Sequence, residues 1–168
     1  MPTGSPSTVC QTCPTCWRLP PLQRGARLPY EEVRDLFERR ANHFAAIEEA
    51  AEAFHAGLEP GNDLTQALKR WLRAEHDISV RRIPVHAMPL WRRRFDRHSM
   101  RLFLSERLSP FDQLREISME ACLLQMRELI LSEIDALKPG SDEARRLARF
   151  ELARYAAHAL MMPYESFR

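Results

Sequence analysis

The sequence predicts an α+β fold that is mostly α-helical, with long helices packed on a small β-hairpin or sheet. Apolar residues recur at helical spacing over 30–57 and again, in two long stripes, after Pro110. Between these regions the prolines at 84 and 89 exclude helix. Met100, Leu102 and Leu104 would share one face of a half-buried strand. These patterns together indicate helices around a small sheet.

The start of the chain differs in composition from the rest. Residues 1–29 hold six of the twelve prolines and three of the four cysteines, and they show almost no periodic apolar pattern. Such a segment cannot bury enough apolar surface to fold alone. We therefore expect residues 1–27 to be a disordered leader rich in cysteine and proline.

The three cysteines of this leader are Cys10, Cys13 and Cys16. They begin like an iron–sulfur or zinc ligand run, but Pro20 stands where a ferredoxin-like run has its fourth cysteine. Three thiolates leave a tetrahedral site incomplete. The sequence leaves open whether they bind metal.

A helical connector is expected over 28–62. It should contain two helices with a break at Asn42 and His43, and Pro60 with Gly61 should end it. After it, Asp63 is a suitable N-cap, with Gln66 three residues on, for a short helix.

The remaining elements follow from local signals. Strands are expected at 78–80, 91–95 and 100–105, with a polar turn at 96–98. One long helix should run from Pro110 to Leu137, and a second, capped by Ser141, should end at Pro163.

Composition argues against several classes of protein. A net charge of +2 gives little support to nucleic-acid binding. The apolar stretches are too short for a membrane span, and the N-terminus lacks a secretory signal, so a cytoplasmic location is expected. The five glycines are isolated, which leaves no phosphate-binding loop.

The second half of the chain resembles IrrE/ImmA-like domains, a metallopeptidase-type scaffold. The resemblance rests on Arg94-Phe95-Asp96, on RLFLSE at 101–106, and on the last helix from Arg145 to Tyr164. The stretch at 28–37 is similar to the segment that joins such domains to a DNA-binding part. The similarity is greatest to the sensory domains of XRE-type bacterial transcriptional regulators, in the branch linked to short-chain fatty-acyl-CoA control.

This resemblance implies a sensory domain over 63–168. Members of the branch begin with a helix-turn-helix and continue beyond the position of Tyr164, so we expect this chain to be the central piece of a larger regulator. DNA would then be bound only through a helix-turn-helix absent from this chain. The resemblance also implies a small effector of acyl-CoA type.

The helix after Pro110 carries the frame of a zinc-peptidase HExxH motif with both histidines replaced. Arg115 and Met119 stand at the two histidine positions, and Glu116 alone matches. A guanidinium stays protonated and offers zinc no lone pair, and a thioether is a poor zinc ligand. Glu151 lies near the place of a third ligand in some relatives, but one carboxylate does not hold a catalytic ion. We therefore expect no enzyme activity, no metal at this motif and no cofactor.

Four residues are candidate effector contacts. Arg92, Arg93 and Arg94, between Trp91 and Phe95, could meet a phosphate-bearing ligand, although such a run is also typical of a solvated edge strand. His158 could contact a ligand or be a core histidine bonded to backbone.

Cys122 is expected to be a small core residue.

Three functions follow for comparison. The first is a non-catalytic sensory or dimerisation domain of a transcriptional regulator, which a homodimer would suit. The second is a zinc-dependent peptidase of the IrrE type. The third is a stand-alone interaction module whose apolar face at 30–57 docks on a partner.

Overall fold

The computed structural model describes residues 28–61 and 63–163. Within them the chain forms six α-helices, a short 3-10 helix (η1) and one three-stranded sheet. The elements in chain order are α1 (Pro29–Arg39), α2 (Ala45–Leu58), α3 (Leu64–His76), β1 (Ser79–Ile83), η1 (Val85–Ala87), β2 (Arg93–Asp96), β3 (Arg101–Ser105), α4 (Pro110–Gln125), α5 (Arg127–Leu137) and α6 (Asp142–Met161). The α+β, mostly α class predicted from the sequence is confirmed.

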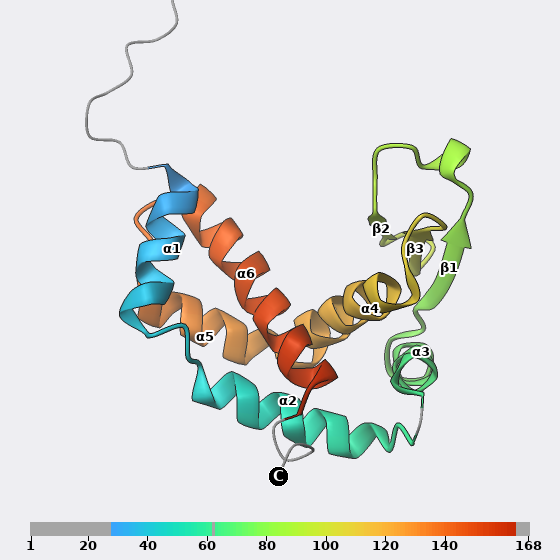
Figure 1. Cartoon of the computed structure of the whole chain (residues 1–168), viewed down its shortest axis with the longest axis horizontal. Helices are drawn as coiled ribbons and strands as arrows, with labels where there is room; N and C mark the ends of the chain where they lie inside the picture. Colours follow the sequence, from blue (N-terminus) through green and yellow to red (C-terminus); the bar gives the residue numbers. More distant parts are fainter. Residues whose placement is uncertain (1–27, 62, 164–168) are drawn as a thin grey trace, which may run out of the picture.

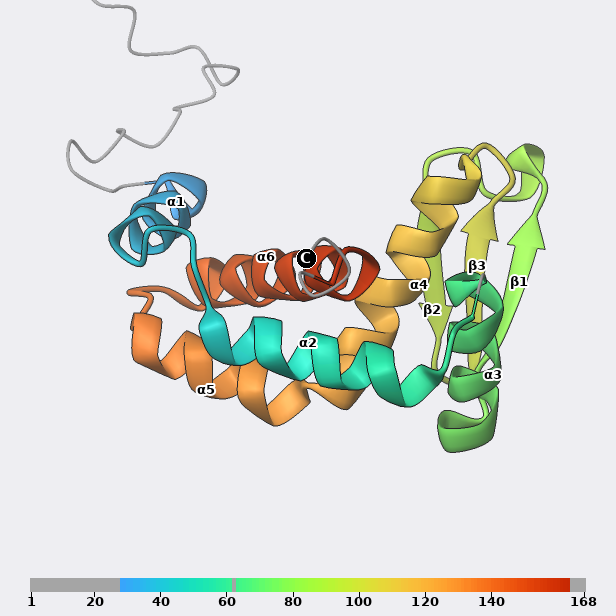
Figure 2. The same cartoon turned by 60° about the horizontal axis from the view of Figure 1, so that its bottom comes forward.

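The elements form two groups (Figures 1 and 2). α2, α5 and α6 run side by side, with α1 at one end, whereas α3 and α4 lie beside the sheet. α4 contacts both α3 and α6, so it joins the two groups. This central place explains why every residue of α4 from Glu116 to Cys122 is buried.

β3 is the central strand of the sheet, which has the order β1-β3-β2. β2 pairs with it antiparallel, with Phe95 opposite Leu102, and this pair is the predicted hairpin. β1 pairs with β3 in parallel, with Val80 opposite Leu102. A parallel pair needs a long connection between its strands, so local sequence patterns do not reveal it.

The expected place of Met100 on the strand face is wrong. Met100 lies in the turn before β3 with a φ of 49°, in the left-handed region that non-glycine residues seldom adopt. Leu102 and Leu104 do share the buried face. The predicted alternation therefore holds for Leu102 and Leu104, whereas Met100 belongs to the turn.

The single helix expected over 110–137 is also wrong, because the chain bends at Met126. This residue has φ −108° and ψ 24° and separates α4 from α5. No proline or glycine stands there, so the bend has a tertiary cause. It lets α5 follow α6 and α2 while α4 runs toward the sheet (Figure 2).

Two predicted helix caps are confirmed. The Asp63 carboxylate accepts a hydrogen bond from the Gln66 amide at 3.0 Å, at the start of α3. The Ser141 hydroxyl accepts one from the Ala144 amide at 3.1 Å, at the start of α6. Each cap satisfies an amide that has no partner inside its helix.

One hydrophobic core runs through both groups of elements. Ile47 of α2, Leu102 of β3, Ile117 of α4 and Leu152 of α6 all belong to it and are fully buried. The apolar stripe of 30–57 thus packs on the rest of the chain. α1 is tied down at both ends, because Glu32 accepts a hydrogen bond from the Gly140 amide at 2.5 Å and Arg40 lies 3.4 Å from Glu133.

Within the described parts of the chain, each helix is too short or too polar to cross a membrane.

Candidate functional site

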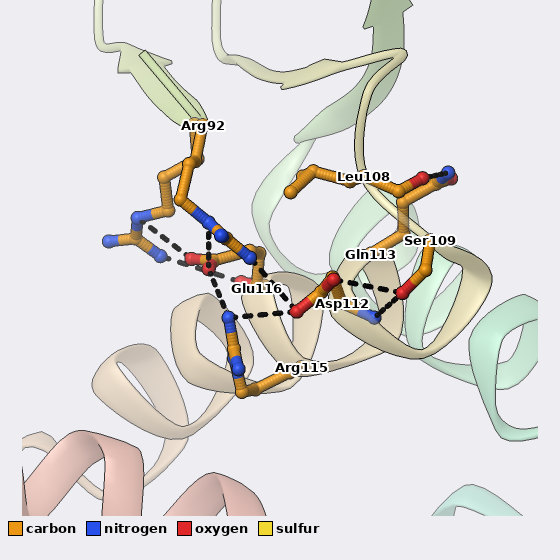
Figure 3. A network of polar contacts seen from close by, with 8 residues as sticks. Arg92, Leu108, Ser109, Asp112, Gln113, Arg115 and Glu116 are labelled. Atoms are coloured by element: carbon orange, nitrogen blue, oxygen red, sulfur yellow. Dashed lines mark hydrogen bonds and ion pairs between the residues drawn. The ribbon is translucent and has the colours of Figure 1, made fainter. Parts of the chain in front are cut away.

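The HExxH position lies in the middle of α4, against the sheet. Met119 is 2% exposed and Glu116 is 7% exposed, whereas the Arg115 side chain reaches a partly open surface. Figure 3 shows the Glu116 carboxylate between Arg92 and Arg115. The nitrogens of Arg115, Arg93 and Arg92 approach it to 3.3, 3.8 and 3.9 Å. Three guanidinium groups therefore surround the one retained acid of the motif.

Glu116 is the middle member of a row of acids on α4. Asp112, Glu116 and Glu120 are spaced four residues apart, so they lie on one helix face, toward β2. Arg92 binds Asp112 at 2.9 Å, and Arg93 binds Glu120 at 3.2 Å. Together with Arg115, these five residues form what we call the ion-pair network; its six members are Arg92, Arg93, Arg115, Asp112, Glu116 and Glu120. It fastens the hairpin to α4.

Asp112, the first acid of this row, is hydrogen-bonded to Ser109, the N-cap residue of α4. The Ser109 hydroxyl donates to Asp112 at 2.9 Å and is the main reason why the pKa of Asp112 lies below its usual value. Slight desolvation opposes this shift, while Arg92 and Arg115 add to it. Asp112 is therefore firmly ionised and available to both arginines.

This arrangement has the chemistry of a structural ion-pair cluster. A zinc site needs several His, Cys, Asp or Glu side chains converging on one point, and no such group occurs within residues 28–61 and 63–163. The Met119 side chain, at the second histidine position, is buried in the protein interior instead. Glu116 would have to leave three guanidinium groups to act as a base.

Arg93 also lines a hollow in the surface. It is a cleft of about 770 Å³ between the hairpin, the α4–α5 bend and α6. Its lining residues are His76, Ile78, Arg93, Phe95, Arg97, Met100, Glu120, Leu123, Leu124, Arg127, Arg146, Arg149 and Phe150. We call it the arginine cleft.

The arginine cleft combines apolar walls with positive charge. Five arginines line it against one acid, Glu120, and that acid is bound to Arg93. Within the described part of the chain, Arg97, Arg146 and Arg149 have no ion pair with an acid. Such a lining suits a ligand with both anionic and apolar parts.

The four predicted effector contacts fall in different places. Arg93 lines the arginine cleft, while Arg92 serves the ion-pair network and borders a smaller hollow. Arg94 is exposed on the opposite face of β2 from Arg93 and Phe95. The structure thus brings one residue of the arginine run into the cleft.

His158 lies in a separate pocket of about 350 Å³ between α2 and α6. Burial is the main reason why its pKa is lowered, with Arg115 and Arg154 adding to the effect. Next to it, the Tyr155 hydroxyl bonds Glu48 and accepts from the Phe44 amide at 3.3 Å. Burial and the Glu48 bond raise the pKa of Tyr155 to about 12.

The remaining predicted residues have simple outcomes. Cys122 is fully buried in the core, as predicted, and burial raises its thiol pKa to about 12. Glu151 contacts Arg154, one turn along α6. Cys10, Cys13 and Cys16 lie outside the described residues.

Sequence reasoning missed four of the cleft arginines: Arg97, Arg127, Arg146 and Arg149. A signal exists for α6, because the spacing of Arg146, Arg149 and Phe150 places them on one helix face. Nothing in the sequence says that this face looks toward the hairpin.

Comparison with known proteins agrees with this scaffold. The IrrE N-terminal-like domain matches residues 73–168. A solved structure described as a Mycobacterium tuberculosis transcriptional regulator superimposes with a TM-score of 0.77 at 30% identity, over 84% of this chain and 43% of that one. The fold is that of an IrrE N-terminal-like domain, and a solved transcriptional regulator shares it. The chain belongs to the IrrE N-terminal-like domain family, which confirms the predicted resemblance.

Full-length relatives are named as regulators. The HTH-type transcriptional regulator RamB of Mycobacterium tuberculosis is 35% identical over 142 residues, which are 83% of this chain and 30% of RamB. PrpR of the same organism is 32% identical over 151 residues, 89% of this chain and 30% of PrpR. The propionyl-CoA carboxylase regulator of Cereibacter sphaeroides is 29% identical over 140 residues, 83% of this chain and 29% of that protein. The chain thus spans about 30% of the length of these relatives.

Proposed function

We propose that this chain is the non-catalytic sensory part of a bacterial transcriptional regulator and that it binds an effector of acyl-CoA type in the arginine cleft. The observation that carries the proposal is the composition of the cleft lining: five arginines, several apolar side chains and one acid. Its relatives are regulators by name. The ion-pair network supports the non-catalytic part, because it holds Glu116 among guanidinium groups.

The chemistry of an acyl-CoA fits this lining. Its phosphates are anions that guanidinium groups bind in pairs of hydrogen bonds, and its acyl chain is apolar. Arg146 and Arg149 of α6 would serve the phosphates, while Phe95 and Leu123 offer apolar contact. A volume of about 770 Å³ suits a ligand of this size.

Regulation requires that the effector prefer one of two states. We propose that residues 28–62 act as the connector to a DNA-binding part and residues 63–168 as the sensory domain. α1 is tied to the α5–α6 loop through Glu32 and to α5 through Arg40, so movement at α6 would reach it. DNA contact would belong to a helix-turn-helix part such as the names of the relatives describe. A homodimer would suit this role, and light scattering of the purified chain would measure it.

The proposal is tested by titrating the chain with acetyl-, propionyl- and butyryl-CoA in a calorimeter. Changing Arg146 and Arg149 together to alanine should weaken binding by roughly tenfold or more, because charge-assisted hydrogen bonds contribute about 1.5–3 kcal/mol each. Arg145→Ala is the matched control, since Arg145 sits on the same helix but pairs with Asp135 at 2.6 Å, outside the cleft. Absence of binding to any of the three thioesters would reject the acyl-CoA proposal.

The peptidase alternative keeps one observation in its favour, the glutamate at position 116. It requires stoichiometric zinc bound near α4. Zinc should be measured after purification without chelators, in a variant whose leader cysteines are changed to serine so that they cannot contribute. We expect far less than one zinc per chain, and one zinc per chain would establish the alternative.

The interaction-module alternative requires a free apolar face at 30–57. Val33, Phe44, Ile47, Ala51 and Phe54 of this region are buried in the common core. Docking through that face would require α1 and α2 to leave α6, so the packing favours the sensory proposal.

A further inference from the structure

The arginine cleft contains one contact that an anionic ligand would have to disturb. Glu120 is 7% exposed, lines the cleft and lies 3.2 Å from a guanidinium nitrogen of Arg93. Arg93 lines the same cleft. A phosphate that approaches Arg93 there meets the Glu120 carboxylate as a like charge beside the same guanidinium.

We infer that Glu120 is a competitor built into the cleft: its carboxylate holds Arg93, and the anionic part of an effector takes over this guanidinium on binding. The inference rests on the proposed function and names the residue that sets its affinity. Glu120 is the only acid that lines the cleft within the described residues, so the competition has one source.

The same exchange would loosen the attachment of the hairpin. Arg93 also lies 3.8 Å from the Glu116 carboxylate and donates to the Glu116 carbonyl oxygen at 3.4 Å. The ion-pair network balances three guanidinium groups with three carboxylates. When Arg93 turns to a ligand, Glu120 loses the guanidinium that it binds and Glu116 loses one of three. An unpaired carboxylate at this burial is unfavourable, so β2 and α4 would separate slightly.

The first part of the test compares affinities for coenzyme A in the full chain. Glu120→Gln removes the competing charge, and Glu49→Gln makes the same change on an exposed residue of α2 outside the cleft. We expect Glu120→Gln to bind coenzyme A at least about fivefold more tightly than wild type, because a charge that opposes a ligand is gone, and Glu49→Gln to match wild type. Glu120→Asp, which keeps the charge but shortens the side chain, serves as a second variant if the first does not fold. It should also bind more tightly.

Hydrogen exchange of β2 supplies a readout that a merely structural role of Glu120 would not produce. In wild type, coenzyme A should speed exchange at 93–96, whereas in Glu120→Gln exchange should be faster from the start and respond less to the ligand, since only the contact of Arg93 with Glu116 is left to lose. Equal or weaker binding by Glu120→Gln would overturn this inference and leave the proposed function intact. Absence of binding by both wild type and Glu120→Gln would overturn both.

Discussion

Glu116→Gln tests the structural role of the motif glutamate. The substitution keeps the shape of the side chain but removes the charge that three arginines share. Breaking a buried ion pair by removing one partner costs about 3–5 kcal/mol. Here Arg92 is largely exposed and two of the three contacts are close to 4 Å, which reduces the effect. We expect the free energy of unfolding to fall by about 2–3 kcal/mol.

The assay is urea unfolding followed by circular dichroism at 222 nm. With a denaturant dependence of roughly 2 kcal/mol per M, the midpoint should move down by about 1 M. Glu128→Gln is the control, because the Glu128 side chain is 89% exposed and lies 3.9 Å from Arg127. Such a surface pair contributes about 0–1 kcal/mol. A Glu116→Gln midpoint equal to that of Glu128→Gln would refute the reasoning, and the network would then have no stabilising role.

The remaining predictions concern a half-buried tyrosine, a buried cysteine and the core. The pKa of Tyr155 rises from 10.0 to about 12 on folding, so its share of stability is fully present below pH 10 and is lost between about pH 10 and 12. The stability difference between wild type and Tyr155→Phe should shrink over that window, and a constant difference in urea melts at pH 9 to 12 would contradict this. Cys122 should react with a thiol reagent only when the chain unfolds, measured in a variant without the leader cysteines; fast reaction in the native state would contradict its burial. Ile47→Ala should cost about 2–4 kcal/mol, whereas Leu90→Ala, at a side chain 90% exposed, should stay within about 0.5 kcal/mol in the same melts. Similar losses for the two would place Ile47 outside the core.

Local patterns were sufficient for most of the helices and for two of their caps. Helical spacing and caps such as Asp63 and Ser141 involve residues only three or four positions apart, so a short stretch of sequence is enough to predict them. The bend at Met126 could not be read in this way, because no helix-breaking residue causes it. Packing of α5 on α6 and α2 selects it, and that packing joins segments far apart in the sequence.

The candidate site shows the same limit at the level of single residues. The arginine run at 92–94 indicated an anion site, but only strand register decides that Arg93 faces the cleft and Arg94 faces away. The other cleft arginines come from the turn after β2, from α5 and from α6. Each is an ordinary surface arginine in sequence, and the tertiary arrangement alone brings them together.

The strand order has a consequence for the route by which the chain folds. Asp96 and Arg101 pair across five residues, whereas Ser79 and Arg101 pair across twenty-two. Closing the longer loop costs about 1 kcal/mol more in chain entropy, so we expect the hairpin to form before β1 joins it. Pulsed hydrogen exchange during refolding would show the hairpin amides protected first, and simultaneous protection would argue against this order. The arginine cleft is lined by Ile78, which precedes β1, and by Phe95 of the hairpin. Its wall would therefore be complete only after β1 has joined the hairpin, late in folding.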